Sequence, residues 1–465
     1  MKTIMLNSTQ IMSALGVALS VFACANKPVV SGPLLALAGE GGSVCEVDES
    51  VTTRSAAYSA NVDLTASVAL PGKAAVDVVM TSRGAIAAVN TENSALLHWV
   101  NPATGEINQT VELPSQVSDI AFDGASRLAI AAEDRLIYLD IATGEEAGSI
   151  RLAGVKRVAI APDGHVAAIA GNIVHLFSPD GREVFTKQRD YTGVTDVEVR
   201  SCGEQQLVYV TSFRNTTFTD LNNRRNPVQI ARLEAIDFTG DVQWSLFGDR
   251  AETIKQNVAD TRLYRVILAR DGYLYIAGES AGTATIFRWR GEPMTEAEQR
   301  GQTEPFLSRI DPYSRLHNSG SAHLPYYARV HPTEGRLVHA QMSFPRKSDT
   351  KANAMRLGDI AVSADGSLYF GGAASASIAN RENLTLNGVP VGGYGGRDRA
   401  WMAITPDFRA REFWTVLAEE GGKGMVRGVD AGYGYSAALS NVESGTVPVT
   451  TGASEGSVFL SFIAE

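Results

Sequence analysis

Short apolar runs alternate with turn signals along most of this chain, and the runs show no helical period. They are rich in Val, Ile, Ala and Tyr and are interrupted by Asp-Gly turns, as in APDGHVAAIAG (161–171), ARDGYLYIAGE (269–279) and SADGSLYFGGA (363–373). Asp-Gly tolerates the positive φ angles that tight hairpins require. The pattern therefore predicts an all-β protein made of strand–turn–strand units.

These units recur as an internal repeat. At spacings of 42, 38, 39, 69, 94 and 69 residues, the same strand position is filled by Asp77, Asp119, Arg157, Asp196, Arg265, Asp359 and Gly428. A β-propeller blade of four short strands needs about 40 residues. The first three steps therefore fit bare blades, and the later steps carry insertions.

A second element ends the units with a third strand, a turn and the start of a fourth strand. Its copies are WVNPATGE (99–106), YLDIATGE (138–145), LFSPDGRE (176–183), AIDFTGDVQW (235–244), RIDPYSRL (309–316) and AITPDFRA (403–410). The repeat predicts a single β-propeller over residues 62–465, with seven blades. Six or eight blades remain open, because the step from Arg265 to Asp359 is long and contains an apparent hairpin at 327–342.

The two ends of the repeat are expected to meet. Each blade packs on its neighbours, so an open array would expose apolar end faces. The segment VDLTASVAL (62–70) precedes the first unit, and the last unit ends at GSVFLSFIAE (456–465). We expect the early strand to complete the last blade beside the C-terminal strand and close the ring.

Two stretches carry a family resemblance. The stretch AAVNTENSALLHWVNPATGEINQTVELP (87–114) resembles the YVTN-type propeller repeat. Residues 359–417 resemble the bacterial repeat of the seven-bladed propeller family, with a glycine-rich turn, Asp398, and a strand and turn at 401–406. The resemblance covers most of residues 74–465 and implies the fold. Such propellers differ widely in function, so it implies no activity.

The N-terminus differs from the repeat. Lys2 precedes an uncharged, mostly apolar run at 11–23, which is shorter than the roughly 20 residues of a membrane-spanning helix and fits a signal peptide. The run ends in VFAC (21–24), which resembles the bacterial lipobox, although Phe22 is larger than the residue usual there. An ordinary cleaved signal peptide and a buried apolar segment are the alternatives.

The lipobox resemblance implies a location. Cys24 would be acylated and become the new N-terminus after removal of residues 1–23, giving an exported, membrane-anchored lipoprotein. Ala25, in place of Asp, favours the outer membrane, at its periplasmic face or on the cell surface. Residues 24–61 are rich in Gly, Ser, Ala and Val and are expected to form a flexible tether.

The charge of the chain argues against one class of partner, nucleic acid. The net charge is −10, so the chain lacks the basic footprint of a nucleic-acid-binding protein. Besides Cys24 the chain has two cysteines, Cys45 and Cys202. In an oxidising compartment they could form a disulfide that pins the tether to the domain. Two unpaired thiols are the alternative.

The repeat also suggests where charged side chains gather. The aligned residues Asp77, Asp119, Arg157, Asp196, Arg265 and Asp359 are candidates for the rim of the central channel. Each Asp is expected to cap a turn or bond backbone within its own blade, and Asp–Arg pairs could form around the rim. The histidines at 317, 323, 331 and 339 are expected to be loop residues. No cofactor is expected, and a divalent cation in the channel is the alternative.

Insertions at 213–230, 281–305, 314–356 and 374–397 lengthen the later units. Long connections are often functional, and these carry basic and aromatic residues. The binding-loop candidates are Arg224, Arg225, Trp289, Tyr326 and Tyr327. Padding without function is the alternative.

The sequence thus favours an envelope lipoprotein whose propeller binds, or is a scaffold for, a protein partner or surface ligand. No residue is assigned a catalytic role. A propeller hydrolase or lyase with a metal in the axial channel is the alternative, and a component of a larger envelope assembly is a third class.

Overall fold

The computed structural model describes residues 45–47, 58–219, 223–248, 259–282, 286–288, 308–309, 311, 323–348, 351–418, 422–445, 447, 449 and 457–465. The chain divides into two units, 1–40 and 41–465, and every described residue lies in the second. Among the described residues, the only helices with both ends described are two short 3-10 turns, η2 (Ile286–Arg288) and η3 (Arg381–Asn383). The all-β expectation is confirmed. The described residues include no helix that is long and apolar enough to span a membrane.

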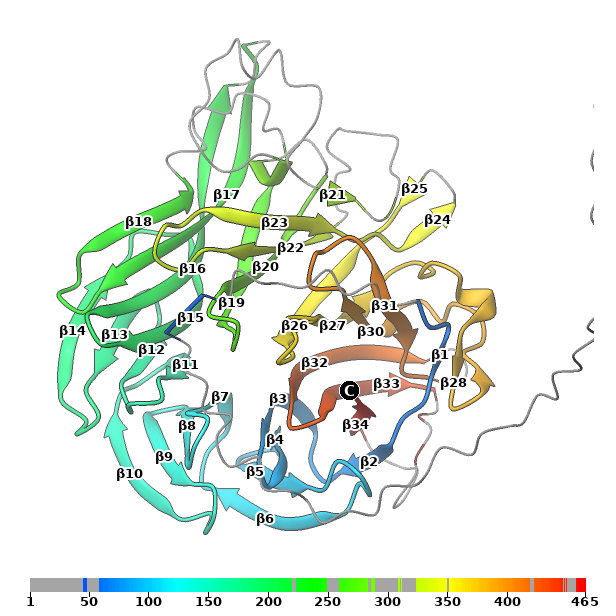
Figure 1. Cartoon of the computed structure of the whole chain (residues 1–465), viewed down its shortest axis with the longest axis horizontal. Coiled ribbons are helices and arrows are strands. Elements are labelled where there is room, and N and C mark those ends of the chain that lie inside the picture. Colours follow the sequence, from blue (N-terminus) through cyan, green and yellow to red (C-terminus); the bar gives the residue numbers. More distant parts are fainter. Residues whose placement is uncertain are drawn as a thin grey trace, which may run out of the picture. The chain divides into compact units, whose positions relative to one another are not determined.

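Four-stranded antiparallel sheets follow one another along residues 41–465 and lie around a common centre, which is the architecture of a β-propeller (Figure 1). In the first four sheets the strands are consecutive: β3 (Ala74–Thr81), β4 (Gly84–Asn90), β5 (Ala95–Val100), β6 (Ile107–Leu113); β7 (Val117–Phe122), β8 (Arg127–Ala132), β9 (Arg135–Asp140), β10 (Glu146–Arg151); β11 (Val155–Ile160), β12 (Val166–Ala170), β13 (Ile173–Phe177), β14 (Glu183–Gln188); β15 (Gly193–Cys202), β16 (Gln205–Thr219), β17 (Arg225–Asp237), β18 (Val242–Phe247).

The next sheet corrects two expectations. Its order is β19 (Thr261–Leu268), β20 (Leu274–Ser280), β22 (Leu324–Val330), β23 (Leu337–Met342), with β21 (Ser308–Arg309) at the edge. The hairpin at 327–342 therefore supplies the third and fourth strands of this sheet and does not form another blade. The segment 309–316 is not the third-strand element, because β22 pairs with β20 along its whole length.

The last strands form two further sheets joined by one bridge between Asp398 and Lys423. One contains β26 (Met355–Val362), β27 (Leu368–Ala374), β30 (Asp398–Ile404) and β31 (Arg411–Val416). The other contains β32 (Lys423–Gly432), β33 (Tyr435–Ser444), β34 (Val458–Ala464) and β2 (Ala66–Leu70). The early strand β2 thus pairs with the C-terminal strand β34, from Ala66 opposite Phe462 to Leu70 opposite Val458.

Small elements decorate the later sheets. Asn61–Val62 (β1) pairs with β28 (Thr385–Leu386), which also pairs with β29 (Val389–Pro390). Arg346–Ser348 (β24) pairs with β25 (Lys351–Ala352). The insertion at 213–230 is mostly not a loop: it lengthens β16 and β17 into a hairpin that extends beyond its sheet (Figure 1).

The core lies between facing sheets. Central strands are buried on both faces, so they are built of small and branched apolar residues throughout; residues 85–89 of β4 are completely buried. One cluster joins Ile86 and Leu97 of the first sheet to Ile120 and Leu128 of the second. Another joins β2, β33 and β34 to the first sheet. The first strands of the sheets lie nearest the centre, where they line a common cavity (Figure 1).

Candidate functional site: the central channel and its mouth

The first strands of the sheets surround a cavity of about 190 Å³. All six charged residues at the aligned repeat position line it: Asp77, Asp119, Arg157, Asp196, Arg265 and Asp359. The repeat therefore identified residues that the fold brings together from different sheets.

The carboxylates bond the next sheet, not their own. Asp119 accepts a hydrogen bond from the backbone N–H of Val158 at 2.8 Å. In the same way Asp196 accepts from the N–H of Val266 at 2.9 Å, and Asp359 accepts from the N–H of Val429 at 3.2 Å. The expectation that each Asp caps a turn or bonds within its own blade is wrong for these three residues.

Asp77 differs from the other aligned carboxylates. One of its oxygens accepts from the N–H of Val78, the next residue in its own strand, at 2.8 Å. Burial, reinforced by the negative charges of Asp359 and Asp119, raises the pKa of Asp77 well above its usual range.

The two arginines at the aligned position pair with these carboxylates. Arg157 donates to Asp119 at 2.8 Å, and its Nε lies 3.8 Å from Asp196. Arg265 donates to Asp359 at 2.7 Å and to the carbonyl of Gly358 at 2.7 Å. Each arginine therefore ties its strand to a neighbouring sheet.

Two further carboxylates, Glu198 and Asp430, line the channel and were not singled out from the sequence. Each lies two residues after an aligned position, and such residues share one face of a strand. That spacing was the signal that could have found them. Glu198 accepts from the N–H of Leu268 at 3.1 Å. Asp430, in the last sheet, accepts from the N–H of Met80 in the first, at 2.5 Å.

Burial shapes the acidity of these groups. It raises the pKa of Glu198 to about 7 and that of Asp430 to about 6, against the hydrogen bonds from backbone N–H groups that lower it. Burial also raises the pKa of Asp196 to about 6, although the nearby arginines Arg157 and Arg265 oppose the shift. The acidic part of the channel therefore carries carboxylates that hold protons unusually well.

A wider cavity of about 600 Å³ lies where the first strands begin. Its lining includes a single carboxylate, Glu279, and five arginines: Arg157, Arg265, Arg356, Arg397 and Arg427. We call this cavity the arginine mouth. Arg157 and Arg265 line both cavities, so the acidic channel and the mouth adjoin at these two residues.

Glu279 organises one side of the arginine mouth. It is buried, and its carboxylate accepts from the backbone N–H of Leu357 at 2.9 Å. The other oxygen lies 2.7 Å from His323 Nδ1 and 3.1 Å from Arg356 Nη1. Glu279 thereby joins His323, which precedes β22, to Arg356 of β26, which lines the cavity.

The binding-loop candidates lie in different surroundings, and two of them are not in a loop. Tyr326 and Tyr327 are not in a loop: they lie in β22 and are completely buried, with Tyr326 stacked 3.9 Å from Phe287. They serve the core because β22 is the third strand of its sheet. Arg224 and Arg225 are exposed at the tip of the β16–β17 hairpin. Trp289 lies outside the described residues.

The histidines do not converge. His323 contacts Glu279, whereas His331 and His339 lie on the β22–β23 hairpin, and His317 lies outside the described residues. His339 lies in strand β23, paired with Arg329, so the expectation of a loop residue is wrong for it. Among the residues that the structure describes, no three His, Cys, Asp or Glu side chains are placed to hold a metal ion.

The sequence also contains G-x-S-x-G at 278–282, a pattern that can mark a nucleophilic serine. The nucleophile elbow requires an exposed serine between a strand and a helix. Ser280 instead ends strand β20, is buried, and donates to the carbonyl of Gly282 at 2.7 Å. It fits a structural role.

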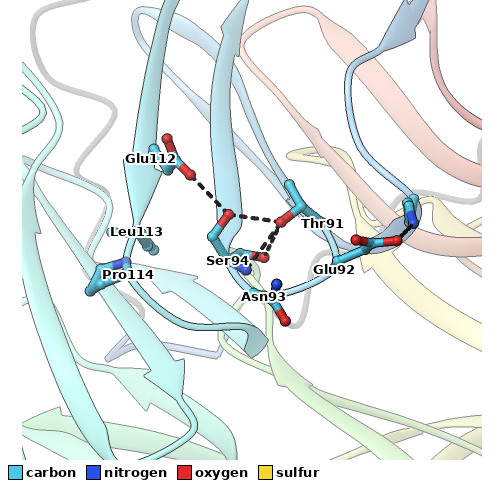
Figure 2. Close-up of a pocket in the computed structure, with 8 residues that line it drawn as sticks. Thr91, Glu92, Asn93, Ser94, Glu112, Leu113 and Pro114 are labelled. Atoms are coloured by element: carbon cyan, nitrogen blue, oxygen red, sulfur yellow. Dashed lines mark hydrogen bonds and ion pairs between the residues drawn. The ribbon is translucent and has the colours of Figure 1, made fainter.

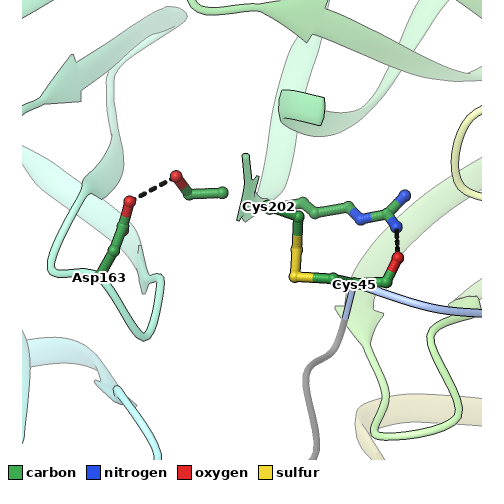
Figure 3. The surroundings of a disulfide bond; sticks show 5 residues. Cys45, Asp163 and Cys202 are labelled. Atoms are coloured by element: carbon green, nitrogen blue, oxygen red, sulfur yellow. Dashed lines mark hydrogen bonds between the residues drawn. A yellow bond between two sulfur atoms is a disulfide. The ribbon is translucent and has the colours of Figure 1, made fainter. Parts of the chain in front are cut away.

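Cys45 and Cys202 form a disulfide, with their Cα atoms 5.3 Å apart (Figure 3). The buried Arg200 donates to the carbonyl of Cys45 at 2.5 Å. The next residue, Glu46, lies so close to Gly272 that a Cβ atom at position 272 would collide with the carbonyl oxygen of Glu46. Residues 45–47 are therefore held beside the turn after β15 and the turn between β19 and β20.

A shallow hollow over the β4–β5 turn is larger, at about 850 Å³ (Figure 2). Its polar groups mostly satisfy one another: Ser94 bonds Thr91 at 2.7 Å and Glu112 at 3.0 Å, and Lys73 pairs with Glu92. It is an open turn surface without convergent unsatisfied groups, so the arginine mouth is the better candidate site.

Comparison with known proteins adds little about function. No protein-family model matches the chain, and no curated protein matches it significantly. A β-propeller domain of Myceliophteria thermophila Cps50 (Swd1) is 10% identical, with TM-score 0.48, covering 86% of this chain and 99% of that one. BamB from Moraxella catarrhalis is 13% identical, with TM-score 0.40 and the same two coverages. Hydrazine synthase from Kuenenia stuttgartiensis is 14% identical, with TM-score 0.42, covering 66% and 78%. At these levels the likenesses do not bear on function.

Proposed function

We propose that this protein is an exported bacterial lipoprotein, anchored through Cys24, whose propeller binds a protein partner or surface ligand of the cell envelope. The propeller has seven blades, one for each four-stranded sheet. Its closure is supported by the pairing of β2 with β34 and by the hydrogen bond from the Met80 N–H to Asp430. An outer-membrane location rests on the resemblance at residues 21–25.

One observation carries the binding role: the arginine mouth opens on the side from which the long insertions leave the sheets. The connections after β16, β20, β23 and β27 all leave at the end where β26 and β32 begin, and residues of those two strands line the mouth. Cavities of some 300–1,000 Å³ are typical of ligand sites. We call this side the insertion face.

Binding is favoured over catalysis because the charged groups of the channel are engaged in holding the sheets together. Asp119, Asp196 and Asp359 each bond the neighbouring sheet, and Arg157 and Arg265 pair with them. The insertion at 374–397 exposes two apolar side chains, Val389 and Tyr394, which are 47% and 40% accessible. Arg397, at the end of the same insertion, lines the mouth.

Site-specific photo-cross-linking in the native host tests this role. A photoreactive residue at Tyr394 should give a discrete adduct with one envelope component, identifiable by mass spectrometry and reproducible with the purified component. The matched control is Val184, which is 40% exposed on the outer strand β14 and away from the insertion face. Adducts from Val184 alone, or none from Tyr394 and Val389, would contradict the proposal.

A further inference from the structure

The arginine mouth is positively charged in a protein whose net charge is −10. Its lining holds five arginines and one carboxylate. The channel cavity, by contrast, is lined by six carboxylates together with Arg157 and Arg265, which contribute to both cavities. The excess of arginine therefore lies in the mouth.

The arginines of the mouth are not equally engaged. Arg157 and Arg265 pair with channel carboxylates. Arg356 shares Glu279 with His323 and remains half exposed. Arg397 pairs with Glu443 at 2.9 Å at the solvent-facing rim. Surface pairs of that kind contribute little stability and exchange readily with other anions.

Arg427 is the arginine of the mouth for which the described residues supply no ion-pair partner. Within the described residues no hydrogen bond or ion pair involves its guanidinium, although its side chain lines the mouth. Partial burial and the positive charges of Arg397 and Arg265 lower the pKa of Arg427, against the attraction of Glu443. An anion placed among these three arginines would relieve their mutual repulsion.

We propose that the arginine mouth binds a ligand bearing two or more oxyanion groups, carboxylate or phosphate, through Arg427, Arg397 and Arg356. Guanidinium groups bind such oxyanions through paired hydrogen bonds, and several of them in one cavity select for multiply charged ligands. The channel is lined by carboxylates as well as by Arg157 and Arg265, so the mouth, with its excess of arginine, is the more favourable place for an anion. This inference rests on the proposed function, because it names the chemistry recognised at the insertion face.

Calorimetric titration of the purified protein at low ionic strength tests the site. The probes are tricarballylate and pyrophosphate as small oxyanions, hexaglutamate as an acidic peptide, and acetate as a singly charged reference. At least one multiply charged probe should bind, at least about tenfold more tightly than acetate, and added salt should weaken it. Preference for hexaglutamate would identify a protein source of the anion, and preference for a small probe would identify a small-molecule source.

Variants tie the binding to the mouth. Arg427→Gln should weaken binding about tenfold, whereas Arg427→Lys, which keeps the charge, should weaken it less. Arg356→Gln should act like Arg427→Gln. The matched control Arg182→Gln removes an exposed arginine from the β13–β14 turn, outside the mouth, and should leave the affinity unchanged.

Three results would overturn the inference: no binding of any multiply charged probe, equal affinity for acetate, or equal weakening by Arg182→Gln and Arg427→Gln. Failure of the inference can be told from failure of the proposed function. If the Tyr394 cross-link persists while no oxyanion binds, only the oxyanion chemistry is wrong. If oxyanions bind but no adduct forms, only the partner-binding role is wrong.

Discussion

The channel carboxylates accept hydrogen bonds from backbone N–H groups that would otherwise be unpaired. The first strand of each sheet is an edge strand, whose inward N–H groups have no neighbouring strand to accept them. Buried N–H groups are costly when unpaired. Asp119, Asp196 and Asp359 reach across to such groups in the next sheet, so one short side chain both satisfies an edge and joins two sheets. This explains why Asp recurs at the aligned position.

Glu198 should make stability depend on pH. Its pKa in the folded protein is about 7, against an ordinary value of 4.5, so ionisation costs the folded state more than the unfolded state. The stability present below pH 4.5 is therefore lost as the pH rises through 7. We expect the unfolding free energy of the wild type to decrease between about pH 5 and about pH 8. In Glu198→Gln this decrease should be smaller by about 1–2 kcal/mol, as measured by denaturant titration at each pH.

The control for this variant is Glu106→Gln, which changes an exposed glutamate in a turn far from the channel. It should leave the pH dependence as in the wild type. A Glu198→Gln protein that loses as much stability across this range as the wild type would show that Glu198 does not resist ionisation.

For single residues, the sequence predicted which side chains line the channel but not their hydrogen-bond partners. The repeat placed Asp196 at the channel, yet its partner Val266 lies 70 positions away along the chain, and only the packing of two sheets brings them together. The glycine at position 428 is explained likewise by packing: a Cβ there would lie 2.8 Å from an oxygen of Asp77. Side-chain partners across sheets depend on distances that a repeat spacing does not contain.

At the level of elements, strand pattern and turn chemistry were enough for the central strands, but the insertions were misjudged. Residues 213–230 continue β16 and β17, because a hairpin can lengthen without a change of pattern. The repeat spacing places Tyr326 and Tyr327 in an insertion, because the long connection after β20 displaces the third strand from its usual position in the sequence. Insertion length is visible in a sequence, whereas its point of attachment to a strand is not.

The strand β2 should be essential to the last sheet. Val68 is buried in β2 opposite Leu460. Val68→Asp would place an unpaired charge in this interface and should lower the unfolding free energy by about 3 kcal/mol or more. Chemical denaturation followed by tryptophan fluorescence measures the loss.

The same substitution at an exposed site is the matched control. Val184→Asp changes a half-exposed valine on the edge strand β14 and should shift the midpoint little. Equal shifts for Val68→Asp and Val184→Asp would mean that β2 contributes nothing to the last sheet.

For the whole molecule, the proposed anchor has a direct test. Metabolic labelling with a palmitate analogue should label the wild-type protein, and Cys24→Ser should abolish the label and release the protein from membranes. Cys45→Ser is the informative control, because it removes a different N-terminal cysteine and should leave labelling intact. Equal labelling of wild type and Cys24→Ser would rule out lipidation at Cys24.

The disulfide also sets the path of mechanical load. Cys202 ends β15 at the side of its sheet opposite the insertion face. If Cys24 is held in a membrane, only the 20 residues from 25 to 44 separate it from Cys45, a reach of at most about 70 Å. Tension on the lipid would then pass through the disulfide into the fourth sheet. The strand β2 follows Cys45 along the chain, so the pairing of β2 with β34 would not carry this tension.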